Sequence, residues 1–197
     1  AWVLGGAWLL RRGVAGWSSI PQAVRLPGGL LALWLAWLAV AQARFVGINF
    51  LLSILVLVWV ADIFAYFAGR AFGGRVAAGK LAPSISPGKS WEGVWGGMAG
   101  VVTLAFLWAW ADRALGTGVA SFYTRLSIHG GWLLLIAVLF MAAMSVVGDL
   151  VESLIKRSAG VKDSSGLLPG HGGVLDRVDA LLPTLPLAMM LVTLGRP

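Results

Sequence analysis

The chain has 197 residues, 59% of them hydrophobic, with eleven tryptophans, 27 glycines and no cysteine. A net charge of +7 would suggest nucleic acid as the partner of a soluble protein, but here the basic residues lie in short segments between long apolar runs. The composition therefore argues against nucleic-acid binding, leaves no disulfide or thiolate metal site, and indicates a helical integral membrane protein.

Six apolar runs follow one another along the chain, separated by polar segments. About 20 helical residues cross a bilayer core, so these runs need only modest tilt or local thinning. We therefore expect an all-α, polytopic transmembrane helical bundle with about six spans, forming one integral membrane domain over residues 1–197. Because the chain opens inside an apolar run without an initiator Met, we also expect further spans before it. The runs are Ala1–Leu10, Gly28–Ala43, Phe45–Ala61, Gly93–Ala111, Gly131–Gly148 and Ala180–Leu194.

Some runs carry additional local signals. The third run is expected to continue as a helix to about Gly69, and the fifth to continue into Lys156. In the fourth, Gly93/Gly97 and Gly96/Gly100 have the small-xxx-small spacing of helices that pack closely in lipid. We expect these glycines to serve packing and not chemistry.

The loop charges are strongly asymmetric. With six alternating crossings, one side of the membrane holds only Arg44, Arg113, Arg125 and Arg196. By the positive-inside rule, the other, more basic side is cytoplasmic. That side holds Arg11, Arg12, Arg25, Arg70, Arg75, Lys80, Lys89, Lys156, Arg157, Lys162 and Arg177.

The segment 149–179 is dense in charge and glycine although apolar runs flank it. Charge beside a membrane is costly and usually functional. An alternative is a basic loop that serves orientation alone. That reading explains the Lys and Arg residues, but not three aspartates and a Pro-Gly-His-Gly-Gly turn, so we interpret the segment as a functional site with loops on the cytoplasmic face.

Carboxylates from three helix ends are expected on this same face. Asp62 ends the third run, Asp149 ends the fifth, and Asp176 and Asp179 precede the sixth. Converging carboxylates suggest a divalent cation with oxygen ligands, most naturally Mg²⁺. The alternative is that each carboxylate caps a helix or pairs with a nearby cation. Both readings stay open for Asp62 and Glu152, whereas for Asp149, Asp176 and Asp179 we favour metal, because exposed ion pairs gain little stability.

The neighbouring cations call for an anionic substrate. Lys156, Arg157 and Lys162 lie among glycines whose backbone N–H groups can approach phosphate oxygens. Lys89 also can reach a phosphate, although its segment is not a P-loop, because Pro83 stands where that motif has its first glycine and no strand precedes it. For His171 we leave open a phosphate donor, an acid or base, and a loop-ordering role.

At these residues the sequence resembles the phosphatidate cytidylyltransferases, or CDP-diacylglycerol synthases. Segments beginning at Asp62 and at Ser86 also resemble that family, with Ser90 in place of its usual threonine, and the resemblance spans about residues 55–190. The family signature reads here as Ser153, Lys156-Arg157, Lys162-Asp163, Pro169, His171-Gly172-Gly173, Asp176-Arg177 and Asp179.

The resemblance implies that CTP and phosphatidate react to give CDP-diacylglycerol and pyrophosphate, with Mg²⁺ as cofactor and a second metal ion left open. It implies an integral protein of the bacterial cytoplasmic (inner) membrane, with membrane lipid as partner, no nucleic acid, and a homodimer left open. The implied catalytic residues are Asp149, Lys156, Arg157, Asp176 and Asp179, of which the three aspartates bind metal. The implied substrate-binding residues are Asp62, Tyr66, Ser86, Lys89, Ser153, Lys162, Asp163, His171, Gly172, Gly173 and Arg177.

Two other functions compete with this interpretation. One is a related CTP-dependent enzyme that acts on another lipid, such as an isoprenoid alcohol kinase or an archaeal lipid cytidylyltransferase. The other is a transporter that uses Asp62 and Asp149 to carry ions. Transport predicts charges near mid-membrane, yet the fourth and sixth runs contain none and the carboxylates gather at one end.

Overall fold

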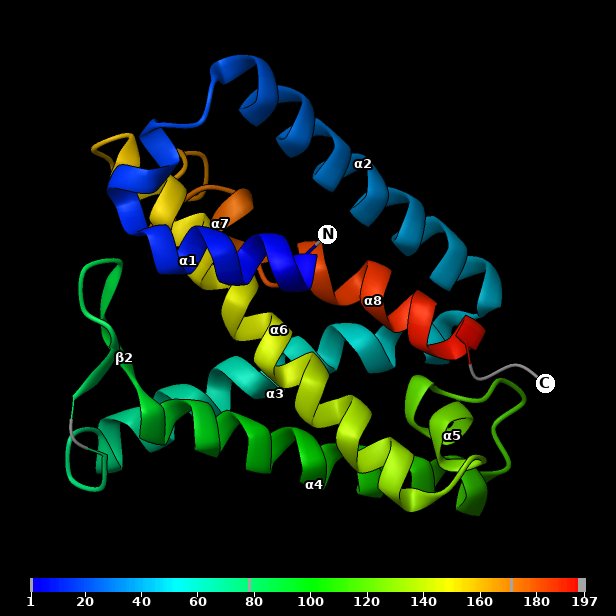
Figure 1. The fold of residues 1–197 in the computed structure, drawn as a ribbon. Coiled ribbons are helices and arrows are strands. Elements are labelled where there is room, and N and C mark those ends of the chain that lie inside the picture. The colour runs from blue at the N-terminus through cyan, green and yellow to red at the C-terminus, as the bar shows by residue number, and fades with distance from the viewer. Residues whose placement is uncertain (1, 78, 171, 195–197) are drawn as a thin grey trace.

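The computed structural model describes residues 2–77, 79–170 and 172–194, and almost every apolar run forms a helix (Figure 1). A small antiparallel hairpin, β1 (Lys80–Ala82) and β2 (Ser86–Ser90), stands where a loop was expected. The helices are α1 (Trp2–Ser18), α2 (Gln22–Val46), α3 (Ile48–Phe72), α4 (Trp91–Leu115), α5 (Phe122–Ser127), α6 (Gly131–Ser158), α7 (Leu175–Val178) and α8 (Leu181–Leu194).

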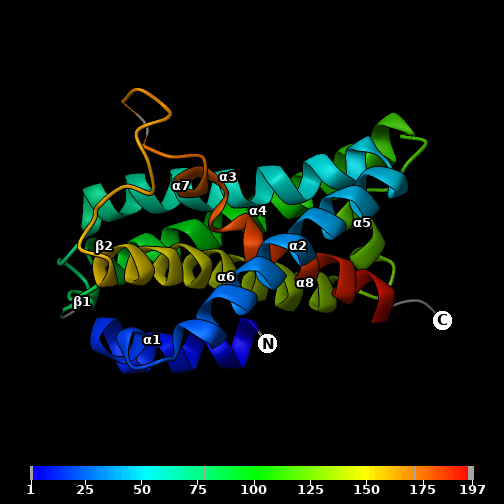
Figure 2. The ribbon, with the colours of Figure 1, turned by 90° about the horizontal axis from the view of Figure 1, so that it is seen from above.

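The long helices run between two ends of an elongated bundle. The β-hairpin and α7 lie at one end, and α5 and the C-terminus lie at the other (Figures 1 and 2). We call the first of these the hairpin end. Consecutive long helices alternate in direction, so the two groups of loops separated by the charge asymmetry lie at opposite ends. The hairpin end therefore carries the segment 149–179 and the basic loops.

Four of the helices are long and apolar enough to cross a membrane: α2, α3, α4 and α6. This confirms a helical, polytopic membrane fold in outline. The first and last expected spans are also helices, but α1 has 17 residues and α8 has 14, short of the roughly 20 needed for a full crossing. The segment Gln22–Pro27, expected as a polar connection, instead forms the start of α2, with Pro21 at its N-cap.

The pair α3 and α4 packs closely because α4 presents glycines to α3. A Cβ atom on Gly97 would lie 2.8 Å from the carbonyl oxygen of Ala61, and one on Gly96 would overlap the Cβ of Ala68. Contacts this short leave no room for any side chain. The small-xxx-small interpretation is confirmed, and the packing fixes the first turns of α4 beside the last turns of α3.

Replacing Gly96 with valine is expected to lower the thermal stability of the detergent-solubilised protein, because overpacking a tight contact typically costs about 1–3 kcal/mol. Ala99→Val is the control. Ala99 is exposed on the same helix, so this substitution introduces the same β-branched residue without a clash. Fluorescence-detected melting would measure both variants. Equal melting temperatures for the two would contradict the close α3–α4 contact.

At the opposite end, a buried polar network closes the bundle. Asp112 accepts hydrogen bonds from Asn49 Nδ2 (2.9 Å), Ser121 N (2.9 Å) and Thr124 Oγ1 (2.6 Å). The connection 112–130, expected only to be polar, folds here into α5, whose Phe122 and Tyr123 are fully buried. The carboxylate of Asp112 therefore has a structural role.

Candidate active site

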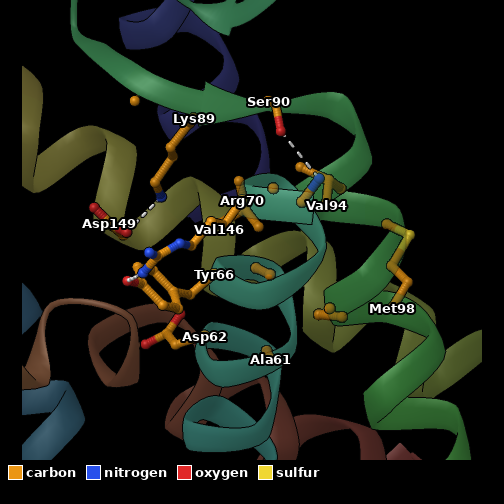
Figure 3. A pocket seen from close by; sticks show the side chains of 16 residues that line it. Ala61, Asp62, Tyr66, Arg70, Lys89, Ser90, Val94, Met98, Val146 and Asp149 are labelled. Atoms are coloured by element: carbon orange, nitrogen blue, oxygen red, sulfur yellow. Dashed lines mark hydrogen bonds and ion pairs between the residues drawn. The ribbon is translucent and has the colours of Figure 1, made fainter. Parts of the chain in front are cut away.

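A cavity of about 520 Å³ opens at the hairpin end between α3, α4, α6 and β2 (Figure 3). Its lining combines charged and polar side chains with apolar ones, and the apolar residues Met98, Ala142 and Val146 lie towards the bundle interior. The polar lining comprises Asp62, Tyr66, Arg70, Lys89, Ser90 and Asp149, and the deeper lining includes Ala61, Gly97, Met98, Ala142 and Val146.

One face of α3 supplies a row of polar groups to this cavity. Asp62, Tyr66 and Arg70 are spaced four residues apart, which places them on one side of a helix, as Figure 3 shows. The Nη1 atom of Arg70 donates to the hydroxyl of Tyr66 at 3.0 Å. From the sequence, Arg70 was expected only to contribute to the charge asymmetry, although its spacing of four residues from Tyr66 and eight from Asp62 is a signal that places it on their helix face.

The β-hairpin delivers Lys89 to the cavity. Ile85 at its turn is only 3% exposed and packs against Leu150 and Leu154 of α6, which fixes the hairpin on that helix. From β2, the ammonium of Lys89 forms a salt bridge with Asp149 (Figure 3). Lys89 therefore meets the charged end of α6, and its expected contact with a phosphate stays a prediction.

Two further residues of the Ser86–Gly93 segment order its surroundings. Ser90 caps α4, its Oγ accepting from the backbone N–H of Gly93 at 3.2 Å. Glu92 is buried, and its Oε1 accepts from the N–H groups of Gly74, Val76 and Ala77 at 3.0, 3.1 and 2.9 Å. Glu92 therefore holds the loop that leads from α3 to the hairpin, a role that the sequence alone did not reveal.

Replacing Glu92 with alanine is expected to release this loop, because three backbone donors lose their shared acceptor. Trypsin should then cleave after Arg75 and Lys80 at least about tenfold faster, since such cleavage follows local opening. Glu92→Gln keeps one carbonyl oxygen and should give an intermediate rate, with cleavage after Arg113 as the internal reference. Unchanged cleavage in the alanine variant would show that other contacts hold the loop.

Further along α6, Lys156 joins two acidic residues. Its Nζ lies 2.6 Å from Glu152 Oε2 and 2.5 Å from Asp176 Oδ1. The side chain of Glu152 is only 5% exposed, and its Oε1 has no hydrogen-bond partner among the described residues. Lys156 therefore ties α6 to the short helix α7. This cluster lies outside the cavity lining.

Asp176 also organises the loop that precedes α7. Its Oδ2 accepts from Ser164 N (2.9 Å), Ser164 Oγ (2.8 Å) and Gly173 N (2.6 Å). Burial opposes its ionisation, but the hydrogen bonds from Lys156, Ser164 and Gly173 outweigh burial and hold the pKa of Asp176 well below its usual range. Both carboxylate oxygens are thus occupied by donors of the protein.

Gly172 and Gly173 of this loop are required by its geometry. Gly172 has φ +80°, which favours glycine, and its carbonyl accepts from the N–H of Leu168 at 2.9 Å. A Cβ atom on Gly173 would collide with the Oγ of Ser164. Gly172 and Gly173 therefore shape the loop around Asp176, whereas their implied contact with substrate stays a prediction.

Asp179 belongs to a different electrostatic group. Burial and repulsion from Asp149 and Asp62 raise the pKa of Asp179 to about 7, although the N–H of Ala180 and the charge of Lys89 act in the opposite direction. The carboxylates that repel one another electrostatically are thus Asp62, Asp149 and Asp179. Asp176, which the sequence analysis grouped with the last two, is bonded to Lys156 instead.

Magnesium stays a prediction in this geometry. Over residues 2–77, 79–170 and 172–194, no three His, Cys, Asp or Glu side chains approach closely enough to hold a metal ion. The carboxylates whose mutual repulsion most resembles that of a metal site are Asp62, Asp149 and Asp179. Carboxylates that repel one another beside apolar helices, with Lys89 as a counter-charge, are of the kind that a divalent cation stabilises.

The remaining predicted residues surround these two clusters. Ser153 Oγ donates to Asp149 Oδ1 at 3.3 Å, and Arg157 Nε donates to the carbonyl of Ile85 at 3.4 Å. Ser86 is half-buried in β2, Lys162 and Asp163 are exposed in the loop, and Arg177 lies on α7. His171 lies outside the described residues.

The arrangement suits an amphipathic, anionic substrate. Cationic side chains stand at the mouth of a cavity whose interior is apolar, so a charged headgroup can stay at the mouth while an apolar portion occupies the deeper part. Two acidic residues, Asp62 and Asp149, and two basic residues, Arg70 and Lys89, line the same cavity, a combination suited to phosphate groups together with a metal ion.

Comparison with known proteins is consistent with this reading. The sequence pattern of the Cytidylyltransferase family matches residues 7–194. A phosphatidate cytidylyltransferase of Haemophilus influenzae is 49% identical over 140 residues, covering 71% of this chain and 44% of the relative. One of Pseudomonas aeruginosa is 44% identical over 164 residues, covering 82% and 55%. One of Thermotoga maritima is 43% identical over 138 residues, covering 70% and 46%. The chain therefore spans about half the length of the relatives it matches.

Proposed function

Because the chain belongs to the Cytidylyltransferase family, we propose that its protein transfers the cytidylyl group of CTP to phosphatidate, forming CDP-diacylglycerol and pyrophosphate. The observation that carries this proposal is the cavity with a charged mouth and an apolar interior. CTP would reach the mouth from water, and the phosphatidate headgroup would reach it from the membrane with its acyl chains in apolar surroundings.

The chemistry fits the groups present. A phosphate oxygen of phosphatidate attacks the α-phosphorus of CTP, and the bond between the α-phosphorus and the bridging oxygen breaks as pyrophosphate leaves. The attacking oxygen is already charged at neutral pH, so no strong base is required. The barrier lies in bringing two polyanions together and in stabilising charge on the transferred group and the departing pyrophosphate.

Basic residues of the chain supply part of that stabilisation. Lys89 stands in the cavity, and Lys156 lies at the end of α6, each already oriented by a carboxylate. Charge-assisted hydrogen bonds to phosphate are about twice as strong as neutral ones. We assign Lys89, Lys156, Arg157 and the loop residue Lys162 to the phosphate groups of the two substrates.

We further propose Mg²⁺ as the cofactor, with Asp149 and Asp179 as ligands and Asp62 beside them. A bound divalent cation would supply charge neutralisation at the phosphates of CTP. Asp176 stays in the proposed metal set, although its oxygens are taken by Lys156, Ser164 and Gly173 in this arrangement. A second metal ion remains an open part of the proposal.

The decisive experiment is incorporation of radiolabelled CTP into lipid by the purified full-length protein, with and without Mg²⁺. We expect label in CDP-diacylglycerol when phosphatidate is supplied, loss of activity in EDTA, and recovery with Mg²⁺ or Mn²⁺. If label were transferred only to another lipid, that lipid and not phosphatidate would be the substrate. Ion counterflow in proteoliposomes without any CTP incorporation would favour the transporter instead.

We propose that the site faces the cytoplasm of a bacterial inner membrane, because the basic loops gather at the hairpin end. The 197 residues of this chain contain no cysteine, so single cysteines placed at Lys80, Lys162 and Arg125 report the sidedness of these positions. The first two should react with a membrane-impermeant maleimide only in inverted vesicles, and the third only in intact spheroplasts. Labelling of position 162 from outside spheroplasts would reverse the topology.

The other partners follow from the same proposal. Membrane lipid surrounds the exposed apolar helices, and nucleic acid has no place in the reaction. Dimerisation stays a proposal that light scattering in detergent would test directly.

A further inference from the structure

The cationic side chains at or beside the candidate active site include Lys89, Lys156 and Arg70, and the partners of these three differ. Lys89 is paired with Asp149, and Lys156 is paired with Glu152 and Asp176. Arg70 donates to the hydroxyl of Tyr66, and no salt bridge joins it to a carboxylate in the part of the chain that the structure describes. Among the described residues, Arg70 is therefore a cavity cation without a salt bridge to a carboxylate.

The phenol of Tyr66 orients the guanidinium without cancelling its charge. A guanidinium carries five N–H donors in a planar fork that fits two oxygens of a phosphate at once. The bond to Tyr66 uses only Nη1, which leaves the other donors of Arg70 for a ligand. Figure 3 shows the Arg70 side chain extending from α3 towards the side of the cavity where Lys89 meets Asp149.

The backbone around Arg70 keeps this position well defined. Arg70 lies in the last turn of α3, where the helix carbonyls favour a cation. The adjacent Gly69 packs against β2 and the start of α4, since a Cβ atom there would lie 3.3 Å from Ser90 Oγ and 3.7 Å from Gly93 Cα. The end of α3 is thus held beside the segment that carries Lys89.

From this geometry we propose that Arg70 is a phosphate-binding residue of the cavity and that Tyr66 is its positioning residue. The inference rests on the proposed cytidylyl transfer. It adds Arg70 to the proposed substrate-binding residues, whereas from the sequence Arg70 was expected only to contribute to the charge asymmetry. The ligand chemistry is a phosphate group with at least two free oxygens. Both the triphosphate of CTP and the monoester of phosphatidate provide one, and the experiment separates them.

The test compares Arg70→Ala, Arg70→Lys and Tyr66→Phe with the wild type, using the full-length protein. Arg75→Ala is the matched control, because Arg75 is an exposed arginine five residues away that does not line the cavity. KM and kcat are measured once with CTP varied at saturating phosphatidate and once with phosphatidate varied in mixed micelles.

We expect Arg70→Ala to raise one of the two KM values at least about tenfold, which is the scale of one charge-assisted contact. That KM identifies the phosphate that Arg70 binds. Arg70→Lys should recover part of the loss, Tyr66→Phe should raise the same KM several-fold with little change in kcat, and Arg75→Ala should match the wild type. Both KM values within twofold of wild type in Arg70→Ala would overturn the inference.

A binding measurement keeps this inference separate from the proposed function. Inorganic pyrophosphate is titrated into the purified wild type and Arg70→Ala, and binding is followed by calorimetry. If the wild type incorporates no CTP but binds pyrophosphate more tightly than the variant, the proposed reaction fails and the phosphate site stands. Equal pyrophosphate affinity together with unchanged KM values refutes the phosphate site alone.

Discussion

Asp176→Asn should lower turnover at least about a hundredfold, which corresponds to about 2.7 kcal/mol of barrier. Asparagine keeps the shape of the side chain but removes the charge that attracts Lys156 and the donors of Ser164 and Gly173. Its amide also offers hydrogen atoms where the loop needs an acceptor. The apolar helices hold the bundle, so the variant should still purify as a folded protein in detergent.

The matched control for this change is Asp112→Asn at the other end of the bundle. Asp112 also accepts several hydrogen bonds, from Asn49, Ser121 and Thr124, but it lies away from the cavity. This variant should melt at a lower temperature while its turnover per folded molecule stays near that of the wild type. Equal turnover losses in both variants would mean that Asp176 acts through general stability.

Titration with Mg²⁺ distinguishes two roles for Asp176. If Asp176 binds the metal, the asparagine variant needs more Mg²⁺ for half-maximal activity. If Asp176 serves only Lys156 and the loop, the maximal rate falls while the Mg²⁺ requirement is unchanged, and the metal assignment then rests on Asp149 and Asp179. Wild-type turnover at limiting Mg²⁺ would exclude both roles.

Lys156→Ala should lower turnover at least tenfold, because a charge-assisted contact to phosphate is worth about 1.5–3 kcal/mol. It should also destabilise the protein, since the buried Glu152 and Asp176 would face each other without the ammonium between them. Radiolabel incorporation and thermal melting measure the two effects separately.

A double variant separates the phosphate role of Lys156 from its structural role. Glu152→Gln combined with Lys156→Ala removes the repulsion and should restore much of the melting temperature. Turnover should stay low if Lys156 contacts phosphate, because no cation replaces it. Recovery of both properties would reduce Lys156 to a link between α6 and α7.

The sequence alone determined the helical membrane fold and the end of the bundle at which the residues of the segment 149–179 gather. Long apolar runs predict helices because the backbone must satisfy its own hydrogen bonds in lipid, which is a local requirement. The glycine spacing of α4 likewise predicted its close contact with α3, because residues four apart share one helix face. Helix formation and the shared face of residues four apart depend on residues close together in the chain, so both can be predicted from the sequence.

Only the tertiary structure decided which charged groups meet. Asp176 and Asp179, three residues apart, were expected to act together, but the donors of Lys156, Ser164 and Gly173 hold Asp176 while Asp179 senses Asp62 and Asp149. Helix spacing predicts a shared face only inside a helix, and α7 has four residues. In the same way, only the packing of α3, α4 and the hairpin showed that Glu92 holds the loop after α3 and that a cavity lies beside the helix face of Arg70, because contacts between distant segments leave no periodic signal in the sequence.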